Sequence, residues 1–158
     1  MSPPLRSGIN PTDHDGDDMR PRIKVLTLAV RDLDRSLRFY RDGMGLQTKG
    51  IVGTEFEDGA VVFFEMNDDL ILALWPKTSL AKDAKVPATP RASTEFSIGH
   101  IVKSKQDVDA VMKQAERAGA KITNSAADRF WGGYSGYLQD PGGHLWEIAW
   151  NPQWEVKD

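Results

Sequence analysis

The sequence predicts an α+β fold made of two βαβββ modules in tandem. The first observation is that strand-like and helix-like segments follow one another in the order βαβββ between residues 22 and 75. The second is that the same order begins again at residue 96 and ends near residue 152. The third is the segment between them, 76–95, which holds three prolines and shows no clear periodicity. This repeat of element order predicts a single domain with an internal linker.

The first module begins with IKVLTLAV, residues 23–30, whose β-branched and leucine side chains are typical of a strand. Asp32 is a favourable N-cap residue for the helix that follows, and Gly45 is a favourable residue just after its end. Apolar side chains lie between them at helical spacing: Leu33, Leu37, Tyr40 and Met44. Three further strand-like segments follow, LQTKGIV, AVVFFEM and LILALWP, with a polar turn, NDD, before the last.

The second module repeats this order. FSIGHIV, residues 96–102, reads as a strand, and Ser104 with Asp107 resembles a capping box at the start of a helix that closes near Gly119. AKIT is a short strand, and GYLQ and HLWEIAW form a hairpin around the turn DPGG. We match Val25 of the first module with Ile98 of the second.

The flanking segments differ in composition from the modules. Residues 1–21 are rich in proline, glycine and aspartate and lack apolar periodicity, so we expect a disordered leader, within which Met19 offers an alternative start. Residues 153–158 form a short tail. We therefore expect the single folded domain to span residues 22–152.

Composition excludes several classes of function. The net charge of −3 and the absence of a long basic run argue against nucleic-acid binding. No apolar run is long enough to cross a membrane and no signal peptide is present, so we expect a cytoplasmic protein that binds no membrane. The chain has no cysteine, which excludes disulfides, thiolate nucleophiles and Cys-zinc sites.

Two motifs resemble the vicinal oxygen chelate superfamily, the glyoxalase, bleomycin-resistance and extradiol-dioxygenase group. They are VRDLDRSLRFYRDGMGL after the first strand and DPGGHLWEIAWNP near the end of the chain, and the resemblance covers about residues 22–152. It implies that each module curls into a half-barrel and that paired modules enclose a cavity. The pairing occurs within one chain or between two chains, and we expect a homodimer.

The resemblance also implies four metal-ligand positions, on the first and fourth strands of each module. In this sequence they correspond to Val25, Ala73, Ile98 and Glu147. Of these side chains only the carboxylate of Glu147 can ligate, and one carboxylate cannot hold a catalytic divalent ion. We therefore expect no cofactor and no family-type metal, with a divalent metal as the alternative.

Strand alternation extends these positions to a cavity lining. If the ligand positions point inward, His100 points inward with Ile98, and Trp75 with Ala73. His100 and Glu147 are then the main ionisable pair of a mostly apolar cavity, and an imidazole beside a carboxylate is suited to acid–base catalysis. The alternative is that both residues are structural.

A glycine-flanked loop near the C-terminus adds aromatic side chains. Phe130, Trp131 and Tyr134 lie in it and either cap the cavity over a planar ligand or form a dimer contact. Tyr137 supplies a hydroxyl to the cavity if its side chain faces inward.

Two functions follow. The first is a metal-independent binding protein, similar to bleomycin-resistance proteins, that sequesters a planar apolar small molecule. The second is a glyoxalase- or dioxygenase-like enzyme (a lyase, isomerase or oxygenase) that uses His100 and Glu147, with or without a divalent metal. Standard glyoxalase I activity is not expected from this ligand set.

Overall fold

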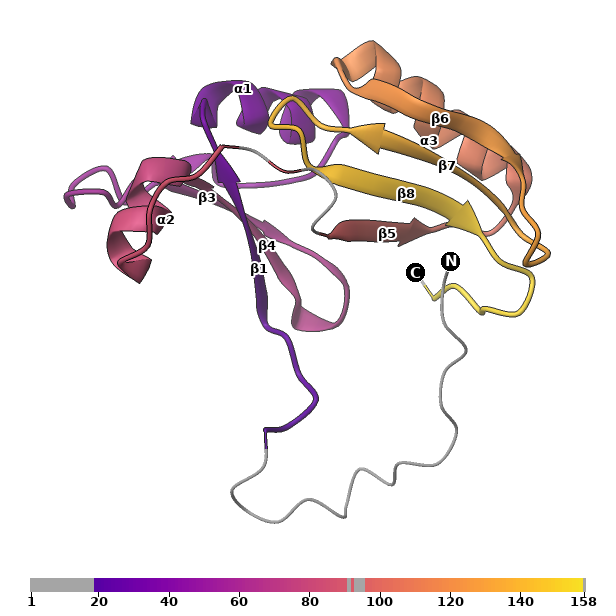
Figure 1. Cartoon of the computed structure of the whole chain (residues 1–158), viewed down its shortest axis with the longest axis horizontal. Coiled ribbons are helices and arrows are strands. Elements are labelled where there is room, and N and C mark those ends of the chain that lie inside the picture. The colour runs from indigo at the N-terminus through magenta and orange to yellow at the C-terminus, as the bar shows by residue number, and fades with distance from the viewer. Residues whose placement is uncertain (1–18, 91, 93–95, 158) are drawn as a thin grey trace.

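The computed structural model describes residues 19–90, 92 and 96–157, and confirms the predicted α+β architecture of two modules. Two four-stranded sheets lie side by side (Figure 1). The first has the order β1 (Val25–Val30), β4 (Ile71–Pro76), β3 (Val61–Glu65) and β2 (Ile51–Val52). The second has the order β5 (Ser97–Ile101), β8 (Leu145–Trp150), β7 (Tyr134–Gln139) and β6 (Lys121–Asp128). In both, the first strand of the module pairs in parallel with the last.

The helix caps predicted from sequence are present. The Asp32 carboxylate accepts a hydrogen bond from the Arg35 amide at 3.0 Å before α1 (Leu33–Arg38), which continues into the π-helical turn η1 (Phe39–Gly43). Ser104 caps α3 (Lys105–Ala118) in the same way, accepting from the Asp107 amide at 3.1 Å. Gly119 then ends α3 with φ of +108°, a conformation that glycine adopts without steric cost.

The helices cover one face of each sheet, and the opposite sheet faces are left uncovered by helices α1 and α3 (Figure 1). Alternation along each strand sends one set of side chains to the helices, and these form a single core that spans both modules. Its largest fully buried members are Phe64, Leu28, Leu74, Val30, Val62 and Val108. We call the other side of each sheet its open face.

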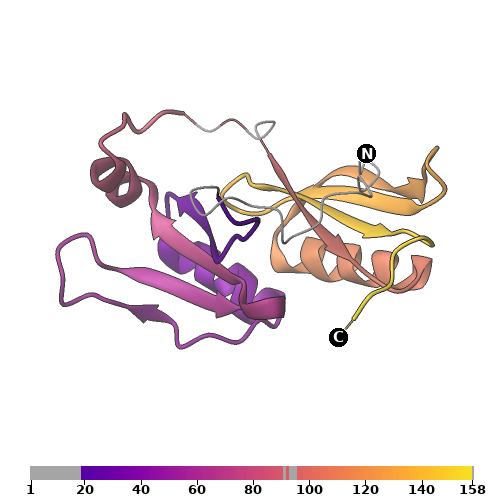
Figure 2. The same cartoon turned by 90° about the horizontal axis from the view of Figure 1, so that it is seen from below.

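The segment between the modules differs from our expectation. We predicted a linker without regular structure over 76–95, but α2 (Lys77–Ala84) occupies its first part (Figure 2). This helix packs on its own module because Lys82 binds Asp58 at 2.9 Å and Ser79 donates to the same carboxylate at 3.2 Å. Lys85, with φ of +57°, ends the helix.

Two other boundaries also move: β2 contains only the last two residues of the predicted LQTKGIV strand, whereas β6 is twice the predicted length. The predicted NDD turn is present as a 3-10 turn, η2 (Asn67–Asp69). Apart from its last three residues, the predicted disordered leader lies outside the described residues. Among the described residues, no helix is long and apolar enough to span a membrane.

Candidate functional site

The open face of the second sheet carries a polar pair in its centre. Ile148 packs in the helix-side core, so its neighbour Glu147 points to the open face. Strand register places Tyr137 directly beside Glu147 on β7, and Gly99 beside it on β5. An added Cβ on Gly99 would meet no atom within 4 Å, so the space over this part of the sheet is open.

The Tyr137 phenol and the Glu147 carboxylate are neighbouring groups on the open face and interact electrostatically. Partial burial of the phenol and the adjacent carboxylate charge raise the pKa of Tyr137 above its usual value of 10.0. Tyr137 is therefore a protonated hydrogen-bond donor at neutral pH. This answers the question left open by sequence, because Tyr137 does face the same side as Glu147.

His100 lies on the other face of the sheet. β5 pairs with β8 so that Ile98 is beside Trp146 and His100 beside Ile148, both of which are helix-side residues. The prediction that Ile98 and His100 point into the cavity with Glu147 is therefore wrong. Partial burial on this side lowers the pKa of His100 below its usual 6.5, which favours the neutral imidazole, although part of the ring stays exposed.

The physical reason is a one-residue error in matching the two modules. Val25 lies seven residues before its helix cap, Asp32, and the residue seven before Ser104 is Ser97, not Ile98. A shift of one residue moves every side chain of a strand to the opposite face. In the structure Ser97 and Gly99 share the open face with Glu147.

The aromatic loop is more ordered than its glycines suggest. Arg129 braces it, because its guanidinium donates to the Ser135 carbonyl at 2.8 Å and to the Ser125 carbonyl at 3.1 Å. The Trp131 ring lies against Gly133, where an added Cβ would overlap the ring. Phe130 projects from this loop with 84% of its surface exposed.

Tyr134 does not belong to the loop, contrary to our expectation. It is the first residue of β7, lies on the helix side of the sheet and donates a 2.6 Å hydrogen bond to Asp109 of α3. Trp75 is half-buried on the open face of the first sheet and donates to the Asp58 carbonyl at 2.9 Å. The aromatic residues predicted from sequence are therefore spread over three surfaces, with Tyr137 nearest to Glu147.

A buried polar network that sequence analysis missed holds the β7–β8 hairpin in place. Asp140 is 4% exposed and accepts hydrogen bonds from the Tyr40 hydroxyl at 2.6 Å and the His144 amide at 2.7 Å. The His144 ring lies 2.9 Å from the same carboxylate, and Trp146 donates to the Tyr40 oxygen at 3.0 Å. The signal available was the DPGG turn, which predicts the hairpin but not its partner on η1.

Comparison with known families agrees with this architecture. The family model of the Glyoxalase/Bleomycin resistance protein/Dioxygenase superfamily matches residues 22–148. The chain belongs to this superfamily. No match was found among curated proteins.

Solved structures show the same fold. A glyoxalase-related enzyme from Fulvimarina pelagi is 33% identical, with a TM-score of 0.76 over 87% of this chain and 93% of that one. A hypothetical protein from S. aureus is 18% identical, with a TM-score of 0.69 over 85% and 96%. A lactoylglutathione lyase from Agrobacterium tumefaciens is 21% identical, with a TM-score of 0.60 over 86% and 98%, which shows the fold alone.

The metal-ligand positions implied by the superfamily resemblance do not fit a metal in this chain. Val25 and Ala73 lie on the open face of the first sheet and carry no donor atom, and Ile98 packs against the core. The open-face neighbours of Glu147 on β5, Ser97 and Gly99, include no imidazole or carboxylate. Within the described part of the chain, no group of three or more His, Asp or Glu residues could hold an ion.

Proposed function

We propose that this superfamily member binds a small molecule on the open face of its second sheet, without a metal centre of the superfamily type. The observation that carries the proposal is the Tyr137–Glu147 pair. Glu147 is the one family ligand position that carries a carboxylate or imidazole, and the Tyr137 phenol lies beside it. A metal ion at Glu147 would have this phenol as its neighbour and would have to find its remaining ligands elsewhere.

Apolar side chains beside the pair, interspersed with the polar Ser97, Ser135 and Gln139 of the same face, favour a ligand that is apolar over part of its surface. Leu145 and Ala149 flank Glu147 along β8, and Ile101 lies beside Ala149 on β5. An apolar surface with one or two fixed polar groups is typical of small-molecule sites. We therefore propose a planar apolar ligand that carries a hydrogen-bond donor for Glu147, held by sequestration as in bleomycin-resistance proteins.

Binding of 2-naphthol, a planar phenol, tests this proposal. We expect saturable binding followed by protein fluorescence, and an affinity at least about fivefold lower in Glu147→Gln, because the charged acceptor is lost. Glu65→Gln is the matched control, since Glu65 is an exposed carboxylate at the end of β3 in the other sheet. Equal affinity in Glu147→Gln and the parent chain would overturn this placement of the site.

A second candidate function is enzymatic, of the lyase, isomerase or oxygenase type. It is favoured by the 33% identity to a glyoxalase-related enzyme. In such an enzyme Tyr137, and not His100, is the residue placed to act with Glu147. A stoichiometric divalent ion in protein purified without chelators, together with turnover abolished by Tyr137→Phe, would support this function and contradict metal-free binding.

We also propose that two chains associate through the open face of the first sheet. Val25 and Phe63 are 44% and 45% exposed there, which is unusual for large apolar side chains on a sheet. Light scattering after size exclusion is expected to give about twice the 17.6 kDa of one chain. Phe63→Glu should reduce this mass to that of a monomer, and a monomeric parent chain would contradict the proposal.

The cytoplasmic location stays a prediction.

A further inference from the structure

We propose that a hollow between the two modules binds a small organic anion. The hollow, which we call the junction pocket, has a volume of about 260 Å³. It lies where β1, the start of α2 and the chain after α2 meet the turn between β7 and β8. Neither Glu147 nor Tyr137 lines it, so the inference does not rest on the proposed function.

The lining of the junction pocket is cationic. Arg31, Lys77 and His144 reach it from three parts of the chain that are distant in sequence. No Asp or Glu is among the described residues that line it. Arg31 and Lys77 also make no ion pair or side-chain hydrogen bond in the described structure, in contrast to Arg41, Lys82 and Lys105.

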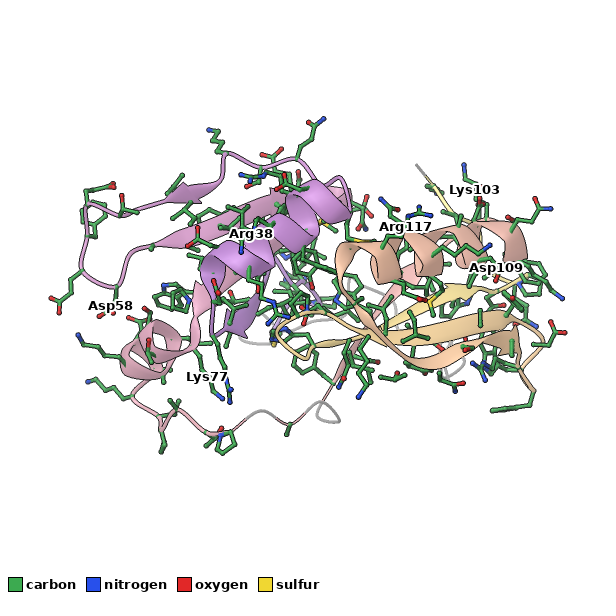
Figure 3. All side chains as sticks on the ribbon, turned by 90° about the horizontal axis from the view of Figure 1, so that it is seen from above. Arg38, Asp58, Lys77, Lys103, Asp109 and Arg117 are labelled. Atoms are coloured by element: carbon green, nitrogen blue, oxygen red, sulfur yellow. The ribbon has the colours of Figure 1, made fainter. Side chains whose placement is uncertain are left out.

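Gathering positive charge in this way is unfavourable unless an anion balances it. Two cations that line one hollow, with no carboxylate among its described lining residues, repel each other. A carboxylate or phosphate group placed between them would instead gain charge-assisted hydrogen bonds from both. Figure 3 shows Lys77 extending from the first turn of α2.

His144 adds a fixed nitrogen to this lining. Its Nδ1 lies 2.9 Å from both Asp140 oxygens and its side chain is only 13% exposed, so the ring orientation is set and Nε2 is left outside this pair. Asp140 is the nearby negative charge. Its oxygens already accept hydrogen bonds from Tyr40 and the His144 amide, and Asp140 itself does not line the pocket.

The apolar residues that line the pocket indicate the character of the ligand outside its anionic group. Leu80, Phe96 and Leu145 give the pocket an apolar side. Its volume lies just below the usual range of about 300–1,000 Å³ for small-molecule sites, which limits the occupant to a small molecule. The class that fits is an organic carboxylate or phosphate monoester with a small apolar body.

Titrations of the full chain with phenyl phosphate, benzoate and neutral benzyl alcohol, followed by ¹H–¹⁵N NMR, test this inference. We expect at least one of the two anions to shift the amide signals of Gly142 and Gly143 in a saturable way. In the double variant Arg31→Gln/Lys77→Gln the affinity should fall at least about tenfold, because two charge-assisted contacts are lost. Comparing the two anions shows whether the pocket prefers a carboxylate or a phosphate.

The matched control is Lys113→Gln/Arg117→Gln, which removes the same charge from exposed positions on α3 that do not line the pocket. It should bind the anions as the parent chain does. The inference is overturned if neither anion binds, if benzyl alcohol binds as tightly as the anions, or if both double variants lose affinity equally. Because both pairs of substitutions are at residues that are not buried, loss of folding is not expected to obscure the result.

Discussion

Tyr40 shows how one side chain ties the two modules together. Its hydroxyl donates to Asp140, one hundred residues further along the chain, and both residues are almost fully buried. Burial and the adjacent carboxylate raise the pKa of Tyr40 well above 10.0, so the phenol remains a donor. Removing the hydroxyl would leave a buried carboxylate with one fewer partner, which is costly.

We therefore predict that Tyr40→Phe lowers the free energy of unfolding by about 1–3 kcal/mol, measured by urea denaturation. Tyr134→Phe is the matched control, because it also removes a 2.6 Å hydrogen bond to an aspartate, but one at the surface of α3. Its loss should be clearly smaller. Equal losses in the two variants would show that the buried network does not contribute specifically.

His100 gives a prediction of pH dependence. Because burial lowers its folded-state pKa below 6.5, the unfolded chain binds more protons in the window between the two pKa values. Stability associated with neutral His100 is therefore present above about pH 6.5 and decreases as the pH falls through that window. The urea midpoint should fall between pH 7 and pH 5.5 by less in His100→Gln than in the parent chain. Identical pH profiles would contradict the partial burial of this imidazole.

Within the β6–β7 hairpin, Gly133 controls the position of Trp131. An added Cβ there would overlap the indole ring and approach the Trp150 carbonyl oxygen at 2.5 Å. We predict that Gly133→Ala displaces Trp131, changes the tryptophan fluorescence spectrum and lowers stability by about 1–3 kcal/mol, as overpacking does. Gly99→Ala is the control, since its Cβ would enter open space, and it should leave both properties unchanged. An unaltered spectrum in Gly133→Ala would contradict this packing.

Local signals explain which elements sequence analysis predicted. The caps at Asp32 and Ser104 and the DPGG hairpin were predicted because each depends on residues a few positions apart. Which side chains of β5 point to the open face was not predicted correctly. A two-residue period is compatible with either orientation of the strand, and only its pairing with β8 selects one. α2 was missed because it is short and because its contact with Asp58 is not indicated by any local sequence pattern.

In the candidate site, too, sequence analysis predicted local features and missed those that depend on tertiary contacts. Glu147 was found from a motif, and Tyr137 was named with its orientation left open. Their side-by-side placement depends on the β7–β8 register, which the hairpin sequence does not fix by itself. The Tyr40–Asp140 contact and the junction pocket bring together residues from separate modules. Such contacts form only in the tertiary fold, and hydrophobic periodicity in the sequence does not predict them.

At the scale of the whole molecule, the two modules meet where η1 packs against the end of α3. A Cβ added at Gly43 would overlap the Ala118 side chain, so the helices approach each other more closely than two alanines would allow. Close helix contact of this kind supports the continuous core that runs through both modules. The side-chain size that is tolerated at position 43 should therefore depend on the residue at position 118.

A double-mutant cycle tests this dependence. Gly43→Ala should destabilise the chain by about 1–3 kcal/mol through overpacking, and Ala118→Gly by about 1 kcal/mol through lost helix propensity. The double variant exchanges the two residues and removes the clash, so its loss should be at least about 0.5 kcal/mol less than the sum of the single losses. Urea denaturation of the four proteins measures this coupling. Strict additivity would show that the modules do not meet at this contact, and a favourable coupling would identify it as a point where they are held together.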